Sequence, residues 1–250
     1  MAEGSAGELI RAARVLATAV DHCTFSAPVT HVLNPLDYAW APYAAYLGRF
    51  ATGPRRVVFL GMNPGPFGMV QVGVPFGEVA AVRDWMGITA PVAQPRKPNP
   101  HRPVEGFACG RSEVSGRRLW ALFRERFGTA EAFFADHLVL NYCPLAFFDR
   151  GRNVTPDKLP AHEAGPLFEA CDAHLRAAVE ALATEWLIGI GKFAAARAER
   201  ALASSAARPR IASILHPSPA SPVANRGWAQ AALRELVALG IWQDDARLRL

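Results

Sequence analysis

Short apolar runs alternate along this chain with longer segments in which apolar residues recur every three or four positions. The short runs predict four buried strands, at Val57–Leu60, Leu138–Leu140, Trp186–Ile190 and Arg210–Leu215. The periodic segments predict helices over residues 5–21, 38–50, 79–86, 115–127, 130–134, 161–183, 192–204 and 228–239. Strands that alternate with helices are typical of a mainly parallel sheet with helices on both faces.

We therefore expect an α/β fold with a central, mainly parallel four-stranded sheet flanked by helices. Residues 1–250 are expected to form a single domain, with a helix within residues 1–25 and a tail over residues 240–250. Residues 28–37 and 142–160 show neither period and are expected to be loops.

The segment that follows the first strand has an unusual composition. Residues 61–77 contain five glycines and three prolines, but no Asp, Glu, Lys or Arg. Open α/β sheets bind ligands beyond the carboxyl ends of their strands, and glycine lets the backbone approach a ligand closely. Such a loop would bind through backbone amides, Asn63, Gln71 and the ring of Phe76. We expect a flat, neutral, polar ligand here rather than a phosphate.

Polar side chains also follow the other strands. Asn141 ends the second strand, His216 follows the fourth, and Asn63 follows the first. Because the carboxyl ends of parallel strands share one edge of a sheet, these side chains should converge on one pocket. Asn beside Pro is often a turn former and a lone His is often structural, so their shared position carries the argument. An Asn amide offers the donors and the acceptor that match the Watson–Crick edge of uracil.

The charge and composition of the chain are compatible with a nucleic-acid partner but do not require one. The chain is 51% hydrophobic and 20% charged, with a formal charge of +5 and a pI near 9.3. This balance is compatible with a polyanionic partner. The proline-rich, basic segment 89–111 is either a solvated loop or a contact to the DNA backbone. The GIGK sequence at 189–192 lacks the spacing of a phosphate loop.

Targeting signals and metal motifs give weaker guidance. The N-terminus has no basic start followed by an unbroken apolar core, and no apolar run approaches the ~20 residues of a membrane span, so we expect a cytoplasmic protein. The cysteines, at Cys23, Cys109, Cys143 and Cys171, form no C-x-x-C pair. They could hold an iron–sulfur cluster, but packed, reduced thiols are the simpler interpretation.

Three motifs together resemble one known family. These are GMNPGPFGMVQVGVPFGEV at 61–79, NYCPL at 141–145 and HPSPASPVANRGW at 216–228, and EVSGRRLW at 113–120 also fits the family pattern. They are similar to those of the single-strand-selective monofunctional uracil-DNA glycosylase (SMUG) family. The resemblance runs from about residue 30 to about residue 240.

The resemblance implies a uracil-DNA glycosylase fold and a monofunctional enzyme of base-excision repair. Its substrate would be uracil, and with it 5-hydroxymethyluracil and related 5-substituted uracils, in single- and double-stranded DNA. Catalysis would fall to Asn63, which positions a water, and to His216, which stabilises the leaving base. The implied base-binding residues are Met62, Gly65, Met69, Phe76 and Asn141. No metal and no cofactor are implied, and we expect a monomer that acts at the nucleoid.

The resemblance also implies a loop, within 217–226, that wedges into the DNA duplex. Its candidate DNA-binding residues are Pro217, Ser218, Pro219, Ala220, Asn225 and Arg226. Vertebrate members of the family have a basic residue where this chain has Ala220. A small residue at the tip should poorly fill the space that a flipped base leaves. If this chain differs from the family, we therefore expect the difference in its preference for duplex DNA and in its retention of the product.

Other interpretations stay open at this point. Segments 96–102 and 117–118, together with Arg226, are candidates to hold phosphates. A superfamily glycosylase directed at mismatched or deaminated purine bases would use a similar pocket. A non-catalytic protein that binds damaged bases would also read the base without releasing it.

Overall fold

The computed structural model of this chain describes residues 4–244 and is built around a parallel sheet. The sheet has four strands in the order β3-β2-β6-β7. They are β2 (Val57–Gly61), β3 (His137–Asn141), β6 (Trp186–Ile190) and β7 (Arg210–Ile214). These are the strands that the apolar runs predicted, and the α/β fold class is confirmed. β2 and β3 are buried along their whole length, as expected for parallel strands covered on both faces.

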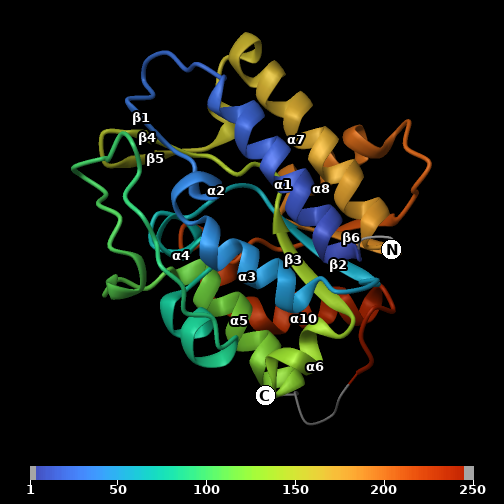
Figure 1. The fold of residues 1–250 in the computed structure, drawn as a ribbon. Coiled ribbons are helices and arrows are strands. Elements are labelled where there is room, and N and C mark those ends of the chain that lie inside the picture. Colours follow the sequence, from blue (N-terminus) through green and yellow to red (C-terminus); the bar gives the residue numbers. More distant parts are fainter. Residues whose placement is uncertain (1–3, 245–250) are drawn as a thin grey trace.

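Helices cover both faces of this sheet. Figure 1 shows α1, α7 and α8 gathered on one side, and α5, α6 and α10 on the other. The longer helices are α1 (Ser5–Asp21), α3 (Trp40–Phe50), α5 (Val114–Phe127), α7 (Ala161–Ala181), α8 (Lys192–Leu202) and α10 (Trp228–Ala238), with the short α6 (Ala130–Phe134) after α5. Their ends agree with the predicted helices to within a few residues. The helix expected at 79–86 covers residues 79–85, and its last five residues form a π-helical turn, η1 (Ala81–Trp85).

A second, antiparallel sheet is the main departure from the sequence prediction. Its order is β1-β4-β5, from β1 (His31–Leu33), β4 (Ala146–Asp149) and β5 (Arg152–Val154). The predictions of loops at 28–37 and 142–160 were therefore wrong in part. These strands are three or four residues long, and β1 pairs with β4 across more than a hundred residues of chain. The hydrophobic periodicity of the local sequence therefore does not predict these strands.

The remaining short elements interrupt segments that were expected to be loops. They are α2 (Pro35–Tyr38), α4 (Met69–Val72), η2 (Gly106–Ala108), η3 (Pro156–Lys158) and α9 (Pro222–Asn225). Asn34 caps α2 by accepting a hydrogen bond from Leu36 N–H, and Ser221 caps α9 through Ala224 N–H. Two of them, α4 and α9, lie inside the loops that carry the candidate site residues.

Side chains hydrogen-bond to the edge strand of the sheet and are buried near the C-terminal end of the described chain. The Tyr46 hydroxyl donates to the Val139 carbonyl at 2.9 Å and accepts from the Val139 amide at 3.2 Å, which satisfies the edge strand β3. Ile241 and Trp242 are buried, and the Trp242 indole donates to His137 Nε2 at 3.0 Å. The expected tail therefore begins after these residues, and its last part, 245–250, lies outside the described residues.

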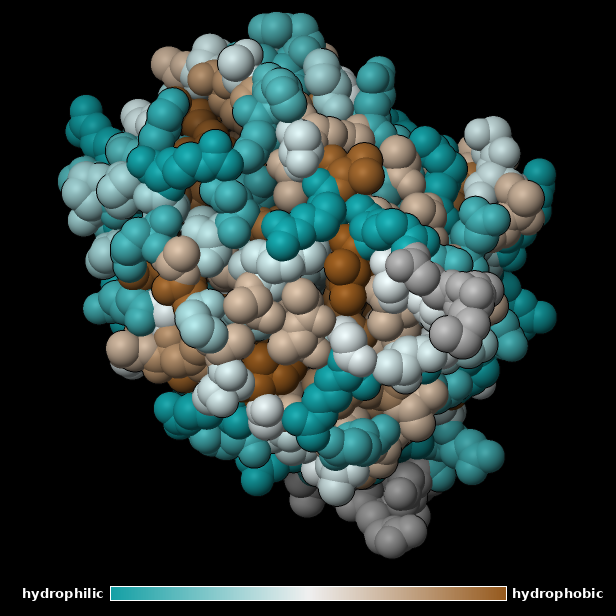
Figure 2. All heavy atoms as spheres, viewed as in Figure 1, coloured by the Kyte–Doolittle hydropathy of each residue, from teal (hydrophilic) through white to brown (hydrophobic). Residues whose placement is uncertain are grey.

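The face of the molecule in Figure 2 is mostly hydrophilic. On this face, hydrophobic side chains occur in small areas between hydrophilic ones. Within residues 4–244, no helix is both long and apolar enough to cross a membrane.

Candidate active site

A cleft of about 340 Å³ opens beyond the carboxyl ends of the central strands. Four separate segments of the chain line it, with Met62, Asn63, Pro64, Gly65, Pro66, Phe76, Glu113, Ser115, Asn153, Thr155, His216, Ser218 and Pro219. Asn63 and His216 thus share one cavity although they come from opposite ends of the chain. Its size falls within the range of about 300–1,000 Å³ that is usual for small-molecule sites.

Asn141 lies behind this cleft, against Gly61. The two residues face each other across the β2–β3 pair, and the space of a Gly61 side chain is occupied by the Phe76 ring and Asn141 Oδ1. Asn141 Nδ2 contacts the Met69 sulfur at 3.2 Å, whereas its buried Oδ1 has no hydrogen-bond partner in residues 4–244. A buried, unpaired acceptor costs about 1–3 kcal/mol. A ligand N–H that reached this oxygen would recover that free energy.

Asn63 is anchored through its amide nitrogen, which leaves its carbonyl oxygen available as an acceptor. Its Nδ2 donates to the Leu145 carbonyl at 3.1 Å, across to the segment that follows β3. The backbone bonds from Tyr142 N–H to Gly61 O and from Cys143 N–H to Met62 O, both 2.9 Å, keep the two segments paired beyond the sheet. The Asn63 carbonyl therefore can accept a hydrogen bond from a water or a ligand, but it is not a base near neutral pH.

His216 lies beside Phe76, where the backbone at Gly191 comes close to the His216 side chain. Gly191 has a φ of 94°, and a side chain there would lie 3.3 Å from His216 Cβ. The rings of His216 and Phe76 have centroids 6.1 Å apart. Burial lowers the pKa of His216, so the imidazole is neutral at neutral pH and can still donate from one nitrogen. Gly191 of the GIGK sequence therefore leaves room for the His216 side chain, which is a packing role and not a phosphate-binding one.

Phe76 holds an uncommon backbone conformation. Its φ is 52°, in the left-handed region that costs a bulky residue about 1–3 kcal/mol. The Trp120 indole donates to the Phe76 carbonyl at 3.0 Å, and Gly116 leaves room for the same carbonyl. Helix α5 therefore fixes the position of the aromatic wall of the cleft.

Glu113 was not among the site residues expected from the sequence. Its Oε2 accepts the Phe67 amide at 3.2 Å, and its side chain fills the space that side chains at Gly65 and Gly68 would need. Burial raises the pKa of Glu113, and the amides of Phe67 and Ser115 act against this shift. The 61–77 loop carries no charge itself, but α5 brings a carboxyl group against it.

The other residues that were missed reach the cleft through tertiary contacts. Ser115 follows Glu113 in the EVSGRRLW motif, which marked the segment without giving it a role. Asn153 and Thr155 come from β5 and the residue after it, in the antiparallel sheet that no sequence pattern predicted.

The candidate DNA-binding residues lie on and around the rim of the cleft. Ser218 and Pro219 line it, Pro217 is buried, and the others, Ala220, Asn225 and Arg226, are exposed.

Some of the basic residues expected to hold phosphates are already engaged. Arg96 forms salt bridges with Asp21 at 3.2 Å and Asp37 at 3.1 Å. Phe67, by contrast, contacts two guanidinium groups, with Arg102 5.0 Å and Arg111 4.0 Å from its ring centre. Arg102 also donates to the Gly151 carbonyl. Two guanidinium groups therefore lie at Phe67, close to the Glu113 carboxyl group.

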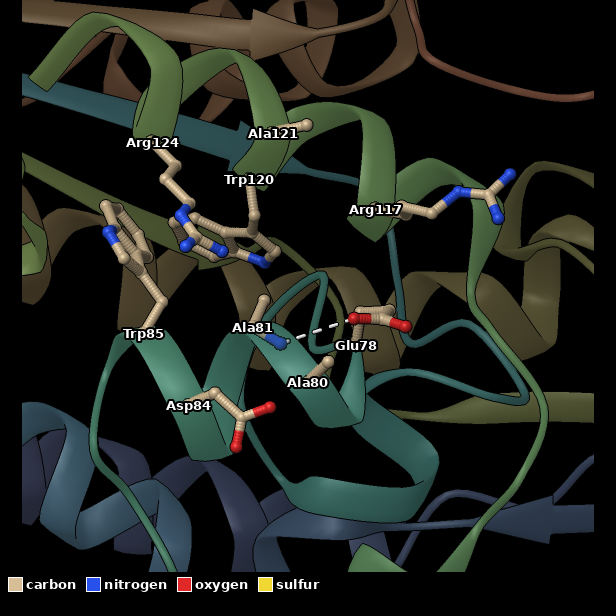
Figure 3. A pocket seen from close by; sticks show the side chains of 9 residues that line it. All are labelled: Glu78, Ala80, Ala81, Asp84, Trp85, Arg117, Trp120, Ala121 and Arg124. Carbon is tan, nitrogen blue, oxygen red and sulfur yellow. Dashed lines mark hydrogen bonds between the residues drawn. The ribbon is translucent and has the colours of Figure 1, made fainter. Parts of the chain in front are cut away.

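A smaller hollow of about 190 Å³ lies between η1 and α5 (Figure 3). Trp85 and Trp120 line it, together with charges of both signs. It contains none of the residues that converge on the main cleft. In residues 4–244, no group of three or more His, Cys, Asp or Glu side chains could hold a metal ion, and all four cysteines are free thiols.

Comparisons with known proteins agree with this geometry. Residues 48–237 match the model of the uracil DNA glycosylase superfamily. The chain belongs to this superfamily. Proteins named single-strand selective monofunctional uracil DNA glycosylase are close relatives. The one from Bos taurus is 49% identical over 87% of this chain and 80% of its own length. The one from Mus musculus is 46% identical over 96% of this chain and 85% of its own length.

These relatives also place the chain in the single-strand-selective monofunctional family, so the resemblance seen in the motifs is confirmed. A crystal structure of SMUG2 from Pedobacter heparinus supports the fold. It aligns with a TM-score of 0.64 and 17% identity, over 92% of this chain and 98% of that chain.

Proposed function

We propose that this protein is a monofunctional DNA glycosylase that flips uracil out of DNA and cleaves its bond to deoxyribose. The observation that carries this proposal is the cleft in which Asn63, Phe76 and His216 meet, with the unpaired acceptor of Asn141 behind them. The cleft supplies neutral donors and acceptors and an aromatic face, as a pyrimidine ring requires.

Base recognition follows from the inventory of the pocket. A base must leave the stack before its glycosidic bond becomes accessible. Phe76 would stack on the extruded ring. Asn141 Oδ1 would accept the N3–H of uracil, and Asn141 Nδ2 would exchange its weak contact with the Met69 sulfur for uracil O4. Cytosine carries no N3–H, so it would leave the Asn141 acceptor unpaired.

Bond cleavage places opposite charges on the two fragments. As C1′–N1 breaks, the sugar becomes positive and the base becomes an anion centred on O2 and N1. Neutral His216 would donate a hydrogen bond to O2 where this charge develops. The Asn63 carbonyl would orient a water whose oxygen attacks C1′. The hydroxyl stays on the sugar, and the proton passes to the base or to solvent.

The scope of the proposal includes 5-substituted uracils. Met69 touches Asn141, which puts the 65–69 turn next to O4 and therefore on the C5 side of the ring. Glu113 fills the space of a side chain at Gly65, but Gly65 itself lines the cleft without one, and we propose that a substituent such as hydroxymethyl is accepted beside it. We further propose that the protein acts as a monomer on single- and double-stranded DNA, in the cytoplasm at the nucleoid.

The test uses pure protein with uracil-containing single- and double-stranded oligonucleotides in EDTA. We expect release of free uracil and strand breaks only after alkali, because none of the described residues that line the cleft is a Lys that could form a Schiff base. Persistent binding without release would instead indicate a damage-binding protein, and a preference for hypoxanthine or xanthine would indicate a purine-directed enzyme. Asn63→Ala and His216→Ala should each lose at least about 100-fold in kcat while still binding DNA. Full activity of both variants would overturn the assigned roles.

A further inference from the structure

The loop of residues 217–225 closes one side of the cleft and exposes an apolar tip. Pro219, Ala220 and Pro222 are exposed, and the Val223 side chain is 50% exposed. Val15 and Val223 are the only large hydrophobic residues within 4–244 that are this exposed. Apolar side chains presented beside a base pocket suit insertion into the space that a flipped base leaves.

Hydrogen bonds fix the shape of this loop from inside. Asn225 Nδ2 donates to the Pro219 carbonyl at 2.9 Å, which ties the two ends of the tip together. Ser218 Oγ accepts the Ala220 amide at 3.1 Å, and Ser221 Oγ accepts the Ala224 amide at 3.2 Å. The tip is therefore closed upon itself before DNA arrives.

Arg118 connects this closed loop to helix α5. One guanidinium nitrogen donates to the carbonyls of Pro217 at 3.2 Å and Ser218 at 3.3 Å. The other donates to Asn225 Oδ1 at 2.8 Å. These three contacts hold both ends of the loop, and Ser115 Oγ adds a bond of 3.4 Å to the Pro217 carbonyl. The side chain expected from sequence to hold a phosphate is thus already bound to protein.

We propose that Arg118 is a positioning residue that holds loop 217–225 in the shape in which its apolar tip enters a DNA duplex. It thereby sets activity on double-stranded DNA relative to single-stranded DNA. Only a duplex has a base-paired stack that must be opened and refilled, so a single strand does not need the tip. This inference rests on the proposed glycosylase function and concerns the substrate form that the same cleft can use.

The experiment compares kcat/KM for uracil in single- and double-stranded oligonucleotides. Arg118→Met keeps the length of the aliphatic stem but removes every donor. We expect its double- to single-strand ratio of kcat/KM to fall by about tenfold or more, mainly through KM for the duplex. Arg118→Lys, which restores one cationic donor, should recover part of the ratio.

Arg117→Met is the matched control. Arg117 is the adjacent residue on the same helix, is exposed, and lines the small hollow beside η1 instead of the cleft. If Arg117 touches phosphate, its loss weakens both substrates alike and leaves the ratio unchanged. An equal loss on both substrates for Arg118→Met would show that Arg118 acts only as a positive charge, and would overturn the proposal.

Two further measurements separate this role from simple loss of folding. In a duplex with 2-aminopurine beside the uracil, Arg118→Met should show a smaller rise in fluorescence on mixing, because fewer bases are extruded. Asn225→Ala removes one acceptor of Arg118 from an exposed site and should lower the ratio in the same direction. The double variant should lose no more than the larger single loss.

If Arg118→Met does not fold, Asn225→Ala decides the question, and an unchanged ratio would overturn the proposal. Failure of the glycosylase function itself would appear separately, since the unaltered protein would then release uracil from neither substrate.

Discussion

The indole nitrogen of Trp120 donates a 3.0 Å hydrogen bond to the carbonyl oxygen of Phe76, whose φ of 52° is rare for an aromatic residue. This bond joins helix α5 to the aromatic wall of the cleft. The same helix and its first flanking residue also hold the other walls, through Glu113 on the Phe67 amide and Arg118 on the 217–225 loop. One rigid element thus positions two segments that are distant in sequence, the 61–77 loop at two points and the 217–225 loop, which is how a site gains precise geometry.

Replacing Trp120 with Phe should weaken catalysis because it removes the donor but keeps an aromatic ring. We expect kcat/KM for uracil to fall about tenfold and the free energy of unfolding to fall by about 1 kcal/mol. Trp85→Phe is the control, since Trp85 lines the other side of the small hollow in Figure 3 and donates instead to Gly128 O at 2.9 Å. It should lose similar stability with full activity. Equal activity of the two variants would contradict the assigned role of Trp120.

Gly61 should tolerate no side chain. A methyl group there would overlap the Phe76 ring and Asn141 Oδ1, so Gly61→Ala should displace both base contacts. We expect a loss of about 100-fold or more in kcat/KM, measured on single-stranded uracil DNA. Gly48→Ala is the control, because nothing lies within 4 Å of a side chain at that position. It should leave activity unchanged and raise the melting temperature slightly.

The acid limb of the pH–rate profile should report His216. Burial lowers its pKa, so the neutral ring persists below the ordinary histidine value of about 6.5. We therefore expect kcat to stay constant as pH falls through ~6.5 and to change only at lower pH. His216→Ala should lack this limb. A rate that instead falls as pH rises through the pKa of His216, and loses this dependence in the variant, would show that His216 is used in its charged form.

The free energy of unfolding should decrease as pH is lowered, because two other buried histidines also have lowered pKa values. Burial lowers the pKa of both His137 and His174 to about 4. Below the ordinary value of ~6.5 the unfolded chain therefore binds protons that the folded chain does not, and the free energy of unfolding decreases until pH reaches about 4. Urea unfolding at several pH values measures this slope. His174→Phe, which also removes an unpaired buried nitrogen, should make the slope shallower, and an unchanged slope would exclude His174 as a contributor.

The salt dependence of DNA binding should identify which arginines meet phosphate. Arg102 and Arg111 flank Phe67 at the rim of the cleft, whereas Arg96, in the same proline-rich segment, is paired with two carboxylates. Arg111→Gln should therefore lower the slope of log K against log salt by about 1. Arg96→Gln should change it much less. If both variants have the same slope, the charge at the Phe67 rim is not a phosphate site.

The apolar pattern by itself determined the central sheet and its helices. A parallel strand buried on both faces is a continuous apolar run, so Trp186–Ile190 was predicted with its observed ends. Asn63 and His216 could be paired from the sequence alone, because β2 and β7 are parallel and their carboxyl ends share one edge. These features depend on local sequence and on one topological rule.

Tertiary structure decided what the pattern could not carry. The β1-β4-β5 sheet, the insertion of Glu113 into the Gly65–Gly68 turn and the unpaired oxygen of Asn141 all depend on contacts between distant segments. Arg118 is the clearest case: its sequence marks a cation on the polar face of an amphipathic helix, but its partners are carbonyls a hundred residues away. Nothing near Arg118 in the sequence encodes that partnership, because it exists only once the loop after β7 lies against α5.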